Sequence, residues 1–170
     1  MRKIRYRVAM SLDGYISGPK GEIDWIIMDP EIDFGAIISQ FDTLLVGRRT
    51  FETMVAAGRT TMPGMKTIVL SRTLDPSQFP GVTIWREGHN EHVASLRAGT
   101  GKDIWLFGGG LLFQSLLEAG LVDTVEVSVI PVLLGGGVPF LPAPASRKQL
   151  DLTAHKIYMS GIVSLQYAVK

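Results

Sequence analysis

Glycines and arginines follow short apolar runs in this sequence, at positions where they could bind phosphate. Gly108-Gly109-Gly110 follows the apolar run 104–107 and precedes leucines at helical spacing, which predicts a strand, a tight turn and a helix. Glycine lets the backbone approach a ligand closely, and the first N–H groups of a helix attract a phosphate. The run matches neither G-x-G-x-x-G nor the P-loop pattern, so a turn that only packs strand against helix is an equally good interpretation.

A second turn of the same kind is Gly47-Arg48-Arg49-Thr50, between the apolar run 43–46 and a helical pattern that begins at Phe51. Two further predicted strands end in Ser71-Arg72 and near Arg86. The carboxyl ends of parallel strands meet at one edge of a sheet, so these groups should lie together. Two glycine-led helix N-termini with several arginines predict a site for a ligand that carries several phosphates.

Composition narrows the classes of protein that remain. The 170 residues predict one domain, 1–170, and a content of 46% hydrophobic and 19% charged residues is typical of a folded globule. A net charge of +1 gives no general attraction to nucleic acid or to an anionic membrane. The absence of cysteine excludes disulfides and thiol nucleophiles. No signal peptide or membrane span is evident, so we expect a cytoplasmic protein.

Two other kinds of site have little support in the sequence. His89 and His92 could bind a metal, but no third ligand accompanies them, and we expect a solvated helix start and no metal site. No Ser-His-Asp set or Walker lysine is visible, which disfavours a hydrolase or a phosphate-transferring enzyme.

The elements that must position the predicted site alternate between strand and helix over residues 1–130. This alternation predicts an α/β three-layer sandwich with a mostly parallel central sheet and helices on both faces. Residues 150–159 and 162–169 read as a closing antiparallel hairpin. The first strand spans 3–11, and its alternation predicts that Arg5 and Arg7 face outward without a functional role.

The first helix carries the candidate acid. Pro30 is suited to open this helix and Asp29 could cap it. Asp33 then shares a face with Ile37, and a carboxylate on an apolar stripe needs a polar partner such as a substrate. An acid in a first helical turn is also favourable without any function, and Glu31 competes for the same role.

Five motifs occur in order along the chain. They are Val8-Ala9-Met10-Ser11-Leu12-Asp13-Gly14, Gly47-Arg48-Arg49-Thr50, Leu70-Ser71-Arg72, Gly108-Gly109-Gly110 and the loop Pro131…Leu134-Gly135-Gly136. This ordered set resembles the dihydrofolate reductase-like superfamily over residues 3–169. It is more similar to the reductase domain of the riboflavin-biosynthesis deaminase-reductase and its stand-alone relatives. The apolar, glycine-rich loop favours this branch, and Asp33 lies near the acidic position of folate reductases with an offset register.

This resemblance implies NADPH as the hydride donor. It assigns the pyrophosphate and adenosine to the turn 47–50, and the 2′-phosphate to Ser71 and Arg72. It assigns the nicotinamide to Ala9 and Ile16. The complete implied cofactor set is Ala9, Ile16, Gly47, Arg48, Arg49, Thr50, Leu70, Ser71, Arg72, Arg86, Phe107, Gly108, Gly109, Gly110, Leu111 and Leu112.

The resemblance also implies a reductase of a small heterocyclic, ribosylaminopyrimidine or pterin-like substrate, most like 5-amino-6-(5-phosphoribosylamino)uracil reductase. Trp25, Asp33 and Ile37 are the expected substrate residues, with Asp33 as the catalytic acid. Trp25 would stack on a planar ring, although it is also a plausible core aromatic. A dihydrofolate-type reductase and a non-catalytic NADPH-binding protein are the alternatives. We expect a small-molecule substrate, no nucleic acid or membrane partner, and a homodimer formed through the apolar 130–142 loop and the final hairpin.

Overall fold

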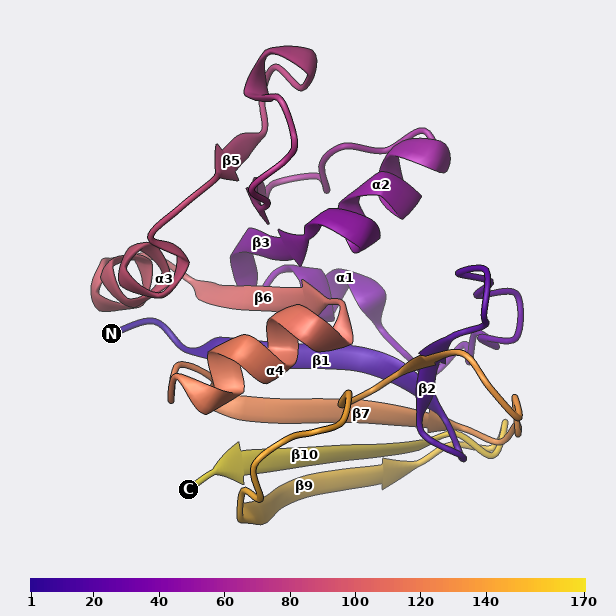
Figure 1. Ribbon diagram of the computed structural model, residues 1–170. Coiled ribbons are helices and arrows are strands. Elements are labelled where there is room, and N and C mark those ends of the chain that lie inside the picture. The colour runs from indigo at the N-terminus through magenta and orange to yellow at the C-terminus, as the bar shows by residue number, and fades with distance from the viewer.

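The computed structural model describes all 170 residues and contains an eight-stranded, mostly parallel sheet, as predicted (Figure 1). The strand order is β5-β4-β3-β6-β1-β7-β10-β9, and only β10 pairs antiparallel, with β7 and β9. The strands are β1 (Ile4–Ser11), β3 (Phe41–Gly47), β4 (Lys66–Leu70), β5 (Thr83–Trp85), β6 (Asp103–Gly108), β7 (Thr124–Ile130), β9 (Leu150–Ile157) and β10 (Val163–Val169).

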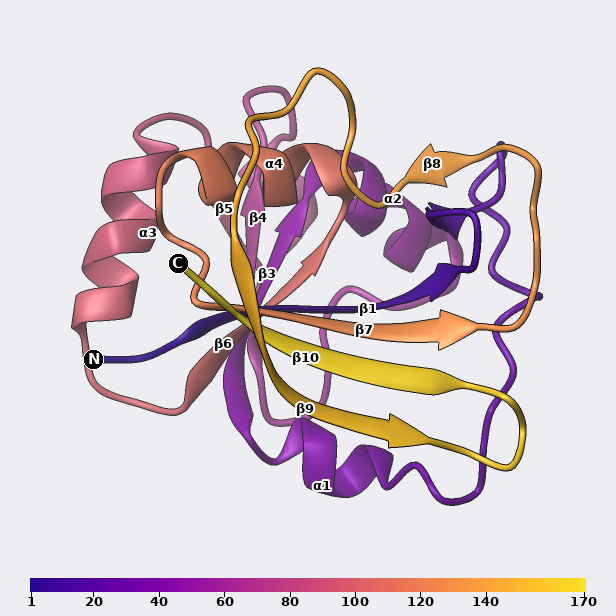
Figure 2. The same cartoon turned by 90° about the horizontal axis from the view of Figure 1, so that it is seen from below.

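Helices cover both faces of this sheet, and Figure 2 shows α1 and α4 on opposite sides of it. The strands alternate, so Leu45 and Leu106 pack with α3 and α4, whereas Leu44 and Trp105 pack with α1 and α2. None of the helices has the length and the apolar composition of a membrane-spanning segment. The helices are α1 (Phe34–Ile38), α2 (Arg48–Ala56), α3 (His89–Ala98), α4 (Gly110–Glu118) and the short 3₁₀ helix η1 (Pro76–Gln78).

The first helix differs from its prediction. It begins at Phe34, and its N-cap is Asp33, whose carboxylate accepts a hydrogen bond of 2.8 Å from the N–H of Ala36. Asp29, the predicted cap, is instead 5% exposed and accepts bonds from the N–H groups of Glu31 and Ser160. Asp29 thus anchors the segment before α1 to the β9–β10 turn, which is a tertiary role that local sequence does not encode.

The third helix, α3, begins at His89. Gly88 precedes it with φ of +60°, a left-handed conformation that glycine adopts readily.

A small second sheet ties two loops together beside the end of β1. It pairs β2 (Tyr15–Ser17) with β8 (Val138–Pro139). Asp13 strengthens this connection, because its carboxylate accepts hydrogen bonds from the Ser11 hydroxyl and from the N–H groups of Leu134 and Gly135. These bonds, that of Ser11 first, hold the pKa of the Asp13 carboxyl below its ordinary value. The turn 18–21 follows β2 directly.

Candidate functional site

Two helix N-termini open side by side at the carboxyl edge of the sheet. The strands β3 and β6 are neighbours, and Val46 pairs with Gly108. Gly47 caps α2 and Gly109 caps α4, and neither supplies a side chain to the first N–H groups of its helix. These donors therefore remain available to a ligand at the edge, where the two helix dipoles also favour negative charge.

The three glycines of 108–110 serve different purposes. Gly108 has φ of +128°, a backbone conformation that other residues rarely adopt. A Cβ on Gly110 would lie 2.5 Å from the carbonyl oxygen of Pro139, so that glycine is required for packing against the 138–142 loop. A Cβ on Gly109 would lie 3.2 Å from Oγ1 of Thr50, in the space between the two helix starts. The packing interpretation therefore applies to Gly110, whereas the ligand-binding interpretation stays a prediction for Gly109.

Arginines line the next part of the same edge. The Arg86 guanidinium donates two hydrogen bonds, of 3.3 and 3.2 Å, to the carbonyl oxygen of Arg72. Both arginines line a groove of about 1190 Å³ between the end of β5 and the start of α3. Arg48 forms an exposed pair with Glu52 at 2.9 Å, which leaves Arg49 as the exposed arginine of that turn without an ion pair. This edge of the sheet therefore has several arginines that could bind a further phosphate group of the same ligand.

The remaining predicted cofactor residues divide into surface and core positions. Ala9, Ile16, Phe107 and Leu112 are half-buried, and Leu111 is 61% exposed. Two others are buried: Leu70 belongs to the core on the α3 and α4 side, and Ser71 is 4% exposed. The Ser71 hydroxyl oxygen accepts bonds from the N–H groups of Thr73 and Leu74. Leu70 and Ser71 therefore shape the turn that presents Arg72.

The predicted substrate residues have structural explanations as well. Asp33 is exposed and caps α1, and Ile37 packs against the core on the α1 and α2 side. The indole of Trp25 donates a 3.0 Å hydrogen bond to the carbonyl oxygen of Glu22. Glu31 is exposed and pairs with Lys156 at 3.1 Å. The catalytic role of Asp33 stays a prediction, since capping alone already explains an acid there.

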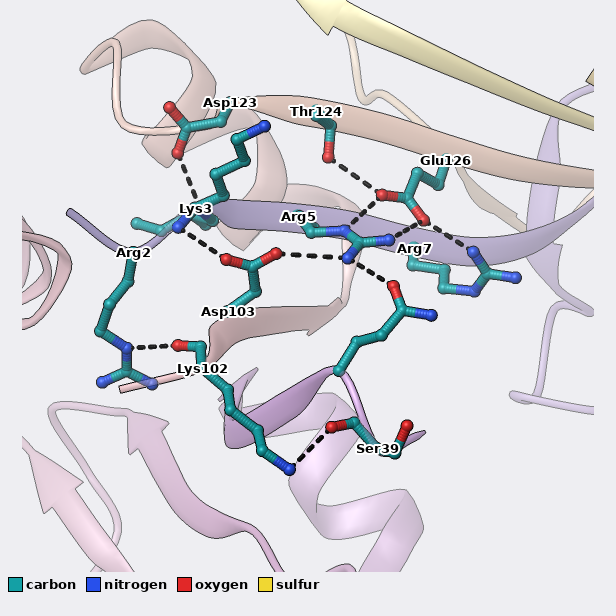
Figure 3. A network of polar contacts seen from close by, with 12 residues as sticks. Arg2, Lys3, Arg5, Arg7, Ser39, Lys102, Asp103, Asp123, Thr124 and Glu126 are labelled. Atoms are coloured by element: carbon teal, nitrogen blue, oxygen red, sulfur yellow. Dashed lines mark hydrogen bonds and ion pairs between the residues drawn. The ribbon is translucent and has the colours of Figure 1, made fainter. Parts of the chain in front are cut away.

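The prediction for Arg5 and Arg7 is wrong, because they bind a buried carboxylate on the neighbouring strand (Figure 3). The Glu126 side chain is 3% exposed. It accepts two bonds from Arg5, at 2.6 and 3.0 Å, and one of 2.6 Å from Arg7. Burial would raise the pKa of the Glu126 carboxyl, but the hydrogen bonds and charges of the two arginines hold this pKa below its ordinary value of 4.5. A signal was present, since Glu126 is the one charged residue of the apolar stretch Thr124–Ile130.

Comparison with solved structures defines the class of this fold. Dihydrofolate reductase from Enterococcus faecalis, complexed with NADP(H) and RAB-propyl, superposes with a TM-score of 0.74 at 22% identity, covering 99% of this chain and 96% of that one. A putative riboflavin biosynthesis protein from Shewanella sp. PV-4 superposes with a TM-score of 0.84 at 26% identity, covering 100% and 99%. The fold is therefore dihydrofolate reductase-like.

Sequence comparison identifies the family within this class. Residues 2–164 match the model of the RibD C-terminal domain, and the chain belongs to that family. YyaP of Bacillus subtilis (strain 168), an uncharacterized protein, is 34% identical over 178 residues, which cover 98% of this chain and 94% of YyaP. These findings confirm the resemblance to riboflavin-type reductases and support an oxidoreductase.

The buried carboxylate makes stability sensitive to acid. Because the folded-state pKa of Glu126 is depressed, its contribution is present above about pH 4.5 and is lost as the pH falls through the folded-state value. We expect Glu126→Gln to lower the unfolding free energy at about pH 7 by about 3 kcal/mol or more, since it leaves the charged Arg7 without an ion-pair partner. The same variant should lose less stability than the wild type between about pH 7 and about pH 3, a range that extends below the ordinary pKa of the carboxyl.

Urea unfolding at both pH values measures these effects. Glu52→Gln is the matched control, because it removes a carboxylate from an exposed arginine pair that is worth at most about 1 kcal/mol. Equal losses for the two variants would contradict a structural role for the buried pair.

Proposed function

We propose that the protein is an NADPH-dependent reductase that transfers hydride to a small heterocyclic substrate. The observation that carries this proposal is the pair of uncapped helix N-termini on neighbouring strands, with arginines at the ends of the next two. A dinucleotide with a pyrophosphate and a further phosphate matches that distribution of donors and cations.

The residues at the sheet edge fit such a cofactor from one end to the other. The first N–H groups of α2 and α4, with Thr50 between them, would bind the pyrophosphate. Arg72 and Arg86 would bind the 2′-phosphate, and the half-buried Ala9, Ile16 and Phe107 would provide an apolar surface for the nicotinamide. When bound, the reduced nicotinamide would supply the hydride, while the chain orients it and excludes water.

For the substrate, the family supports a heterocycle related to 5-amino-6-(5-phosphoribosylamino)uracil. A dihydrofolate-type substrate is the second candidate, because the fold is shared with dihydrofolate reductase. A non-catalytic NADPH-binding protein would show the same cofactor affinity without turnover. Oxidation of NADPH in the presence of ribosylaminopyrimidines and pteridines distinguishes these three possibilities.

A homodimer and a cytoplasmic location also remain proposals. For the dimer, the supporting observation is the exposure of apolar side chains on the two predicted contact segments. Leu133 is 69% exposed in the 130–142 loop, and Ile157 is 71% exposed in the final hairpin.

The cofactor proposal makes a prediction about the 2′-phosphate. Arg72→Ala should weaken NADPH binding by roughly 1–3 kcal/mol and NADH binding much less, because only NADPH carries the phosphate that the guanidinium would bind. Titration of each cofactor, followed by nicotinamide fluorescence, measures both affinities. Arg59→Ala is the control, since Arg59 is an exposed arginine beyond the C-terminus of α2. Equal losses for NADPH and NADH would place the phosphate elsewhere.

The glycine run permits a paired test. Gly109→Val should abolish NADPH binding while the protein stays folded, because its side chain would crowd Thr50 between the two helix starts and would not strain a backbone φ of −85°. Gly110→Ala should instead destabilise the fold, since its Cβ would overlap the Pro139 carbonyl oxygen. Circular dichroism melting and NADPH titration separate the two effects. Normal NADPH affinity in a folded Gly109→Val protein would show that the glycine run 108–110 is only a turn that packs strand against helix.

The proposed acid can be tested without disturbing the helix. Asn caps a helix about as well as Asp, so Asp33→Asn should preserve α1. If Asp33 protonates the substrate, this change should lower turnover by roughly two to four decades and leave NADPH affinity unchanged. Glu31→Gln, measured in parallel under single-turnover conditions, tests the competing acid. Full activity of Asp33→Asn would exclude Asp33 as the proton donor.

A further inference from the structure

A polar cavity of about 160 Å³ lies on the sheet beside the Glu126 network. Four neighbouring strands form its floor. In the register of the sheet, Arg7 of β1 lies beside Glu126 of β7. Ser164 of β10 lies between Ser128 of β7 and Lys156 of β9. The lining residues that matter for binding are Arg7, Glu126, Ser128, Lys156, Ser164 and Gln166. These side chains come from four strands that the sheet order places in succession, so only the tertiary structure assembles them.

The cavity has more hydrogen-bond donors than its own carboxylate uses. The two oxygens of Glu126 accept four bonds, from Arg5 twice, from Arg7 and from the Thr124 hydroxyl. Arg5 also binds Gln40 and Asp103, so its charge is matched outside the cavity. Arg7 makes a single side-chain bond, through Nη1, and its other guanidinium donors have no partner.

Lysine and hydroxyl groups add to this excess. Lys156 lines the cavity and forms an ion pair with Glu31, and its Nζ also lies 4.4 Å from the centre of the Tyr158 ring. Both side chains of the ion pair are about half exposed, so that pair is weak. Ser128 and Ser164 bond to each other at 3.1 Å, and one of the two hydroxyl hydrogens is left free. The guanidinium of Arg7 and a free hydroxyl at one small cavity, with the weakly paired Lys156 in its wall, favour a carboxylate or a phosphate group.

The position of the cavity connects it to the proposed site. Arg7 and Ala9 point to the same face of β1, and Ala9 pairs with Ser128 of the cavity wall. Ala9 is also the residue expected beside the nicotinamide. We infer that this cavity is an anion-binding site that takes a carboxylate or phosphate group, and that it orients an anionic substrate next to the cofactor. Anion binding stands on the cavity alone, whereas the link to a substrate rests on the proposed function.

Titration with inorganic phosphate and with acetate, at constant ionic strength in chloride, tests anion binding directly. We expect saturable shifts of the backbone amide NMR signals of Ser128 and Ser164, which report from the cavity wall and not from Arg72. Arg7→Met should weaken this binding by about tenfold or more, the loss of one charge-assisted contact, and Arg7→Lys should retain most of it. Absence of a saturable shift, or unchanged affinity in a folded Arg7→Met protein, would overturn the inference.

A matched pair of lysine variants separates the cavity from general surface charge. Lys156→Met should weaken anion binding several-fold. Lys170→Met should not, although Lys170 forms an equally exposed pair with Asp151 at the opposite end of the same strand pair. Equal effects of the two changes would show that long-range electrostatics explains the binding, and would contradict an anion-binding site in the cavity.

Competition experiments identify the anionic group and test the link to the substrate. Pterin-6-carboxylate represents a heterocycle with a carboxylate, 6-hydroxymethylpterin is its neutral counterpart, and ribose 5-phosphate represents a sugar phosphate. We expect at least one charged compound to displace inorganic phosphate from the cavity and the neutral pterin to fail. If neither charged compound does so, the link to the substrate is wrong. NADPH titration of the same samples reports separately on the proposed function, which fails if NADPH does not bind.

Discussion

The structure depends on the parallel pairing of β6 with both β3 and β1 in the centre of the sheet. Parallel neighbours must end at the same edge, and each of the turns after β3 and β6 leads directly into a helix. The two helices therefore begin side by side with their first N–H groups free. Their dipoles and the nearby arginines concentrate positive potential at this edge, which an anionic cofactor would neutralise.

The two faces of the sheet differ in the side chains that they carry. Toward α3 and α4, its strands carry a continuous apolar core that includes Leu45, Ile104 and Leu106. The other face also has an apolar core, where β3, β4 and β6 pack against α1 and α2. Beside this core, β1 and β7 carry Arg5, Arg7 and Glu126, which form ion pairs. A buried ion pair contributes little net stability compared with apolar packing, but a lone buried charge costs much. The network therefore fixes which side chains stay charged and where Arg7 can point.

Much of the fold could be predicted from the sequence because its signals are local. Apolar runs followed by glycine predicted the strands and the turns at Gly47 and Gly108, and alternation predicted the closing hairpin. The order of the motifs predicted the family. The predicted start of the first helix was wrong, because Asp29 and Asp33 are both good N-cap residues by local criteria. Only the contact of Asp29 with the β9–β10 turn decides between them.

The sequence by itself determined the residue types at the carboxyl edge: glycine where the backbone must turn or approach closely, and arginine where charge is concentrated. Tertiary structure alone decided which glycine has which purpose, because Gly110 meets Pro139 and Gly109 meets Thr50 through chain segments far apart in sequence. It also decided that Arg5 and Arg7 face a buried carboxylate rather than water. Alternation along one strand defines two faces, but what covers each face depends on the neighbouring strand, and here β7 places Glu126 beside the arginines.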